Sequence, residues 1–113
     1  MAYSKDQAIA IALEFLRGAA GRHRIRCAFL FGSTVWGHPQ AYSDIDLAIV
    51  LEEGADASQT PFGEAFAVFH EAQEFNSALE VVCLSEAEFA DDSQSLVRRI
   101  RKEGLELPLP IAA

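Results

Sequence analysis

Several residue types that would tie this chain to a particular class of protein are scarce. It has two cysteines, Cys27 and Cys83, and both lie inside apolar stretches without nearby metal-ligand partners. We therefore expect two small, buried, reduced thiols rather than a disulfide framework or a zinc site. No apolar run approaches the roughly 18 residues of a membrane span, and the first ten residues lack the basic-then-apolar pattern of a signal peptide. These absences favour a cytoplasmic protein that does not enter a membrane.

Basic residues are also few. Nine lysines and arginines stand against seventeen aspartates and glutamates, so the formal net charge is −8. Such a chain is not expected to bind nucleic acid or anionic membranes through broad electrostatic attraction. It is better suited to cations or to a basic protein partner. Half of the 113 residues are hydrophobic, which argues against disorder and allows one core, so we expect a single domain over residues 1–113.

Helices and strands are expected to alternate along the chain. Ser4 and Gln7 form a capping box that opens a helix over 4–19, and we expect Gly18 and Gly21 to end it. A second capping box, Ser85 with Glu88, opens a later helix. The other expected elements are strands over 25–31, 44–51 and 79–84, helices over 61–76 and 96–102, and an extended tail after Gly104. This α-β-α-β-α-β-α order predicts an α/β domain with one small sheet covered by helices.

Other side chains in these elements carry simpler expectations. Phe62, Phe66, Phe69 and Phe75 recur along the 61–76 helix and are expected to face the core, although some could serve as a partner surface. We expect two histidines, His23 and His70, at the surface. The last helix is expected to place its basic cluster on its polar face and near its C-terminal end, where cations suit the helix dipole; the cluster is Arg98, Arg99, Arg101 and Lys102.

Two acids begin the second predicted strand. Asp44 and Asp46 are one residue apart, so their side chains share one face of that strand. A third acid, Glu80, interrupts the apolar run SALEVVCL of the third strand. Mg²⁺ prefers few protein carboxylates together with waters and substrate phosphates. The three acids therefore indicate a magnesium site of the kind used in metal-assisted phosphoryl transfer.

A glycine and a serine end the first predicted strand, with ten residues between Ser33 and Asp44. Gly32 allows close backbone approach, and Ser33 offers a hydroxyl and a backbone N–H at the start of a helical turn. We interpret the pair as a seat for phosphate. The plainer alternative is a strand-end turn followed by two solvated acids, with Glu80 an edge-strand acid that faces water.

The pattern Gly-Ser, ten residues, Asp-x-Asp resembles the signature of the polymerase-β-like nucleotidyltransferase superfamily. The short chain and the string SDIDL resemble its minimal prokaryotic branch, the MNT domains. The resemblance implies a mixed three-stranded sheet flanked by about four helices. It also implies that Gly32 and Ser33 bind the nucleotide, and that Asp44, Asp46 and Glu80 are the catalytic residues and the Mg²⁺ ligands.

Two departures from the family pattern stand out. Glu80 occupies a position that is more often aspartate, and is one methylene longer. The stretch Val35-Trp36-Gly37 lacks the arginine that many relatives carry shortly after the Gly-Ser pair. A cation near the triphosphate would stabilise the charge that develops as the bond breaks. The candidates to replace it are Arg24, Arg26, His38 and Lys102.

The resemblance implies a Mg²⁺-dependent enzyme that transfers AMP from ATP to a hydroxyl. Such domains are commonly paired with a helical HEPN-type toxin, so the resemblance implies an antitoxin that neutralises this partner. The short chain leaves little room for an acceptor-binding domain, so another protein, or a second copy in a homo-oligomer, would bring the acceptor. Two alternatives stay open: a catalytically impaired module that neutralises the toxin by contact alone, and an antibiotic-modifying nucleotidyltransferase that works as half of a dimer.

Overall fold

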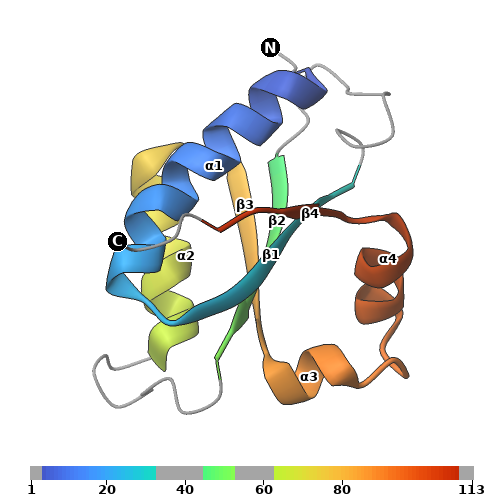
Figure 1. Cartoon of the computed structure of the whole chain (residues 1–113). Coiled ribbons are helices and arrows are strands. Elements are labelled where there is room, and N and C mark those ends of the chain that lie inside the picture. The colour runs from blue at the N-terminus through green and yellow to red at the C-terminus, as the bar shows by residue number, and fades with distance from the viewer. Residues whose placement is uncertain (1–3, 33–44, 53–62, 110–113) are drawn as a thin grey trace.

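The computed structural model describes residues 4–32, 45–52 and 63–109 (Figure 1). The first half of the chain contributes α1 (Lys5–Arg22), β1 (Ile25–Phe31), β2 (Ile45–Leu51) and α2 (Gly63–Phe75). The second half contributes β3 (Leu79–Ser85), α3 (Glu86–Ala90), α4 (Ser95–Glu103) and β4 (Leu105–Leu107). Each expected helix and strand lies within a few residues of its expected position. None of the helices in the described ranges has the length and apolar content needed to cross a membrane.

The sheet has four strands in the order β3-β2-β1-β4. β1 pairs antiparallel with both β2 and β4, whereas β2 and β3 are parallel. The α/β fold with a small mixed sheet and four helices is therefore confirmed. One strand was not expected, because the tail after Gly104 pairs with β1 over Leu105–Leu107 instead of remaining merely extended.

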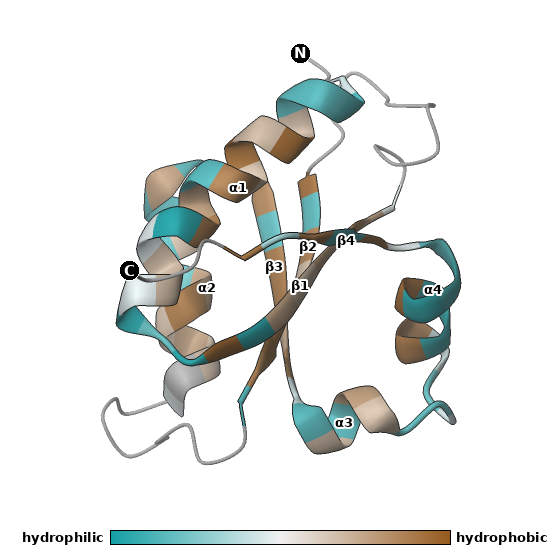
Figure 2. Ribbon diagram, in the orientation of Figure 1, coloured by the Kyte–Doolittle hydropathy of each residue, from teal (hydrophilic) through white to brown (hydrophobic). Residues whose placement is uncertain are grey.

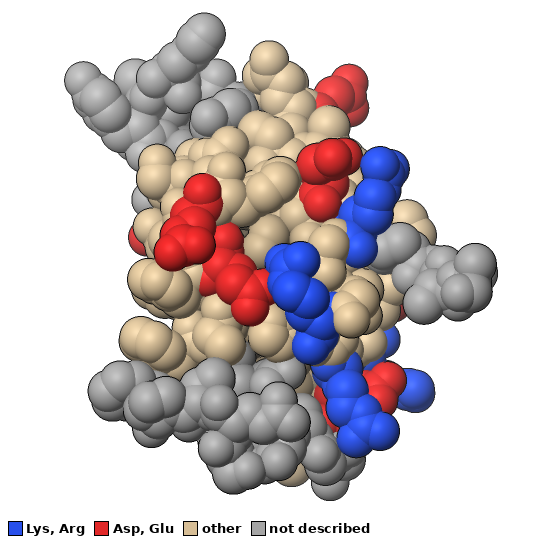
Figure 3. Space-filling view, turned by 90° about the vertical axis from the view of Figure 1, so that its left-hand side faces the viewer, with Lys and Arg blue, Asp and Glu red and all other residues tan. Residues whose placement is uncertain are grey.

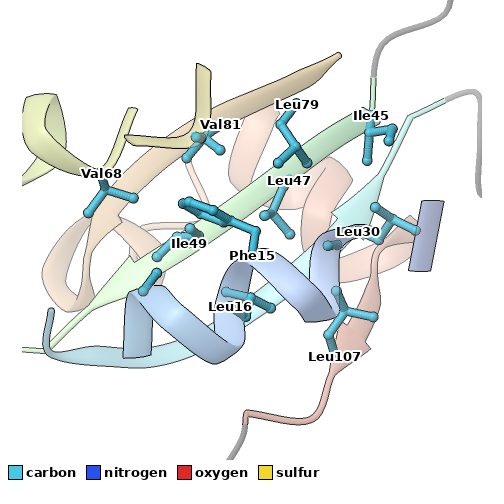
Figure 4. Packing of buried hydrophobic residues seen from close by; sticks show 14 of the residues in the cluster. Phe15, Leu16, Leu30, Ile45, Leu47, Ile49, Val68, Leu79, Val81 and Leu107 are labelled. Atoms are coloured by element: carbon cyan, nitrogen blue, oxygen red, sulfur yellow. The ribbon is translucent and has the colours of Figure 1, made fainter. Parts of the chain in front are cut away.

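Helices cover both faces of the sheet, with α1 and α2 on one side and α3 and α4 on the other (Figure 1). The larger α1/α2 cluster includes Phe15, Leu16, Leu30, Leu47 and Val68. Figure 4 shows Phe15 of α1 pointing toward Ile49 of β2. The smaller α3/α4 cluster consists of Phe31, Ala48, Leu84, Val97 and Ile100. The strands are largely apolar at the sheet centre (Figure 2) because both faces are covered.

Both capping boxes form as expected. Ser4 accepts a hydrogen bond from the backbone N–H of Gln7, and Ser85 accepts one from that of Glu88. The prediction that Gly18 and Gly21 end the first helix was wrong, because α1 continues to Arg22. A glycine inside a helix costs about 1 kcal/mol relative to alanine. The burial of Leu16 and Ala19 in the core offsets that cost.

The expectation that the α2 phenylalanines face the core was also wrong for those that the structure describes. Phe66, Phe69 and Phe75 are 47%, 44% and 48% exposed, whereas Val68 and Ala72 are fully buried. Val68 and Ala72, four positions apart, place small side chains against the sheet, and Phe66 and Phe69 lie on other sides of the helix. Phe75, at the end of α2, is half-exposed although its ring lies 5.7 Å from that of Phe15. Phe62 lies outside the described residues.

His23 was expected at the surface, but its side chain is only 8% exposed, whereas that of His70 is exposed as expected. His23 Nε2 lies 2.7 Å from Glu71 Oε2, and Arg22 Nε donates to Glu71 Oε1 over 2.7 Å. These contacts join the end of α1 to α2. Figure 3 views this side of the molecule, where acidic and basic side chains lie close together.

We expect Glu71 to make the stability depend on pH. Burial alone would raise the pKa of the Glu71 carboxyl, but hydrogen bonds from Arg22 and His23 outweigh it and lower the pKa below 4.5. A lowered pKa in the folded state gives stability that is present at neutral pH and is lost as the pH falls below about 4.5. Glu71→Gln should lower the unfolding free energy by about 1 kcal/mol at pH 7 and by less at pH 3.5.

Urea unfolding at the two pH values measures this difference. Glu74→Gln is the matched control, because Glu74 lies on the same helix, pairs with the exposed His70 and has a side chain that is 71% exposed. An equal loss at both pH values in Glu71→Gln would contradict the linkage.

Candidate metal and nucleotide site

Two of the predicted site residues lie side by side in the sheet. β2 and β3 are parallel, and their register pairs Asp46 with Glu80. On its other side Asp46 pairs with Phe31, the last residue of β1. Paired residues on neighbouring strands point to the same face, and neighbouring strands lie about 4.8 Å apart. Asp46 and Glu80 therefore belong to one cross-strand row on one face.

That face is the one covered by α3 and α4. Phe31, in the same row, packs with Val97 and Ile100 of α4. The residues on either side of Glu80, Leu79 and Val81, turn to the opposite face and are buried in the α1/α2 cluster. The row lies where β1 ends and where β2 and β3 begin, so the carboxylates stand at one end of the sheet.

The two carboxylates differ in their exposure. β3 is an edge strand, and Glu80 is exposed on it, whereas Asp46 lies on a central strand and is half-buried. The exposure of Glu80 is compatible both with a solvated acid on an edge strand and with a metal ligand. The pairing of Glu80 with Asp46 is what distinguishes it from an acid placed at random on the edge.

Gly32 directly follows β1 and is buried, with a φ of +85°. This is the left-handed region, which glycine adopts without steric cost. A Cβ on Gly32 would collide with Asp46 Oδ2 and would lie 3.0 Å from Asp46 Cγ. The backbone after β1 and the Asp46 carboxylate are therefore in close contact, which a sequence can indicate only through the presence of a glycine.

The remaining predicted site residues, Ser33 and Asp44, lie outside the described residues, as do Trp36 and His38. Among the residues that the structure does describe, no three His, Cys, Asp or Glu side chains form a metal-binding group. The donors it does bring together are oxygen atoms of two carboxylates, which suit Mg²⁺. The missing side chain of Gly32 also fits a metal site, because it leaves room for the Asp46 carboxylate.

The structure narrows the choice of a replacement for the missing arginine. Arg24 and Arg26 lie at the opposite end of β1 from Gly32, roughly 20–26 Å away along the strand. Arg26 Nε is also 3.3 Å from Glu86 Oε1. Neither side chain can reach the carboxylate end. Lys102 is exposed near the end of α4 and remains a candidate.

The α4 arginines are engaged in structural contacts. Arg101 lies over the Phe89 ring, 4.3 Å from its centroid, and donates to the Phe89 carbonyl. Arg99 pairs with Glu103, and Arg98 donates to the carbonyls of Asp92 and Ser93. These contacts agree with the expected polar face of the last helix.

The cysteines do not add a reactive group to this site. Neither is part of a disulfide, and both are half-buried, less enclosed than expected. Burial, with a smaller contribution from the negative charge of Glu106, raises the pKa of the Cys27 thiol. A raised pKa keeps the thiol protonated and unreactive near neutral pH.

Comparison with known proteins identifies the chain. A family model described as polymerase beta, nucleotidyltransferase matches residues 16–107. A search of curated proteins found no match. A crystal structure of a candidate nucleotidyltransferase from Sulfolobus solfataricus shares the fold, with a TM-score of 0.60 at 18% sequence identity; the match covers 90% of this chain and 80% of that one. The matched segment contains Gly32, both aspartates and Glu80, and we conclude that the chain belongs to the polymerase-β nucleotidyltransferase family.

Proposed function

We propose that the protein is a Mg²⁺-dependent nucleotidyltransferase that transfers AMP from ATP to a hydroxyl on a partner protein. We further propose that this partner is a helical HEPN-type toxin, which the chain neutralises as an antitoxin. The observation that supports a catalytic site is the register between β2 and β3, which sets Asp46 beside Glu80 at the end of the sheet where Gly32 follows β1. Membership of the family supplies the class of reaction.

The side chains have separate tasks in this proposal. Asp44, Asp46 and Glu80 would hold the divalent cation, and Gly32 and Ser33 would bind the phosphates. Bound Mg²⁺ supplies charge neutralisation for the triphosphate and a lower pKa for the attacking hydroxyl. Because Glu80 is exposed, its carboxylate is accessible to accept the proton of that hydroxyl. The acceptor oxygen bonds to the α-phosphorus of ATP as the bond to pyrophosphate breaks.

The acceptor is proposed to come from outside this domain. The net charge of −8 favours a basic partner, because opposite charges speed association and discriminate against acidic proteins. A second copy of the chain in a homo-oligomer is the other source of acceptor surface. Neither nucleic acid nor a membrane is proposed as a partner.

Label transfer tests the enzymatic proposal. We expect α-³²P-ATP and Mg²⁺ to label the product of the neighbouring gene, and we expect the label to fall to background in Asp44→Asn/Asp46→Asn or with EDTA. Replacing two carboxylates by amides keeps the side-chain size and removes the charges that hold the cation. Persistent transfer in the double variant would show that the chemistry is located elsewhere.

A contact antitoxin is the second candidate function. The missing arginine after Gly32 favours it, as do the exposed rings of Phe66 and Phe69, which give α2 an apolar surface. The same double variant separates the two functions. Toxin neutralisation that persists in cells without any label transfer would favour contact alone.

A further inference from the structure

The volume that a side chain at position 32 would occupy is taken by another residue. The three atoms nearest to a Cβ placed on Gly32 all belong to Asp46. They are Oδ2, which would collide with it, Cγ at 3.0 Å and Cβ at 3.3 Å. The Asp46 carboxylate thus lies directly over the Gly32 Cα. The two positions are adjacent because the β1–β2 register pairs Phe31 with Asp46.

Relief of this conflict requires the Asp46 side chain to move. Oδ2 occupies the space of the methyl group, Cγ and Cβ are in tight contact with it, and the Asp46 backbone is held in the centre of the sheet between β1 and β3. A methyl group at position 32 would therefore rotate the aspartate side chain and displace its carboxylate from its place beside the end of β1.

We infer that Gly32 is a positioning residue for Asp46, in addition to any contact it makes with a nucleotide. Its missing side chain leaves free the space that the Asp46 carboxylate occupies beside the end of β1. The inference deepens the proposed function, because the orientation of Asp46 matters most if the carboxylate binds a cation. Glycine at this position would thus orient the Asp46 carboxylate on β2 as well as bind the phosphate.

Thermodynamic coupling tests the contact without any metal. Gly32→Ala should lower the urea midpoint, both because φ is +85° and because the methyl meets Asp46. An Asp46→Ala background removes the contacts with Oδ2 and Cγ and leaves the positive φ and the milder 3.3 Å contact with Cβ, so at least half of the loss should disappear. An equal loss in both backgrounds would overturn the inference. If Gly32→Ala does not fold, folding restored by Asp46→Ala supports it, and failure of both variants to fold overturns it.

Metal affinity tests the consequence for the site. Titration of Mn²⁺ by electron paramagnetic resonance should show at least tenfold weaker binding to folded Gly32→Ala than to the parent protein. Gly21→Ala is the matched control, because nothing lies within 4 Å of a Cβ at that exposed position, and its affinity should be unchanged. Equal affinity in Gly32→Ala and the parent would overturn the inference. A parent protein that binds no Mn²⁺ would instead overturn the proposed function, and the coupling measurement would still decide whether Gly32 positions Asp46.

Discussion

Leu47→Ala should lower the free energy of unfolding by about 3–5 kcal/mol, at the upper end for a leucine truncation. Leu47 is fully buried and pairs with Leu30 on one side and Val81 on the other, in the middle of the α1/α2 face. Its removal leaves a cavity under α1 that rigid neighbouring strands cannot fill. A domain of this size has about 5–15 kcal/mol of stability in total, so this variant should be close to unfolding at 37 °C.

Chemical denaturation of the parent and the variant measures the loss. Leu13→Ala is a suitable control, because Leu13 is a leucine of α1 that is only half-buried at the margin of the same cluster. Alanine is also a good helix former, so the control should cost about 1 kcal/mol. Similar losses in the two variants would mean that the sheet centre is less tightly packed than the structure indicates.

The second large effect is expected at Glu80. If this carboxylate accepts the proton of the attacking hydroxyl and helps to hold the cation, Glu80→Gln should reduce the rate of label transfer by about 10²–10⁴-fold. The side chain is exposed on an edge strand, so the unfolding free energy should change by less than about 0.5 kcal/mol. Glu80→Asp should retain activity, since it restores the acid that is commoner at this position in the family.

Glu106→Gln provides the comparison for Glu80. Glu106 is an exposed acid on β4, the opposite edge of the sheet, and it pairs with Phe29, which packs against the α3/α4 cluster. It therefore points to the same face as Glu80 but lies outside the Asp46 row. We expect unchanged transfer in Glu106→Gln. Full activity in Glu80→Gln would identify Glu80 as an edge-strand acid that only faces water.

Local signals in the sequence were sufficient for most elements of the fold. The hydroxyls of Ser4 and Ser85 act within three residues, so the two capping boxes could be recognised directly. The limits of β1 also follow from a largely apolar run that ends at a glycine. Such features depend on neighbours along the chain, and the structure agrees with them.

Features that depend on distant neighbours were not predictable in the same way. The burial of His23 depends on Glu71, and the exposure of Phe66 depends on how closely α2 approaches the sheet. β4 could not be foreseen because nothing in LEL distinguishes an extended tail from a paired strand. In each case tertiary contacts decide the outcome, and periodicity within one element does not encode them.

The candidate site combines features that depend on local sequence with features that depend on distant neighbours. The residue types were recognisable because Gly32, Asp46 and Glu80 each interrupt or end an apolar strand. Their proximity was expected from the resemblance to the family, but the residues alone do not determine it, because it requires β2 to run parallel to β3 and antiparallel to β1 in one particular register. The roles of these residues, and those of Ser33 and Asp44, stay predictions.

The short β4 strand has a consequence for the order in which the molecule assembles. It joins Leu105 to Leu30, two residues separated by most of the chain. Contacts between such distant residues form late, since a long loop must close first. During synthesis, before Leu105–Leu107 has left the ribosome, one side of β1 therefore has backbone amides and carbonyls without a strand partner. The nascent chain is most prone to aggregation during this period.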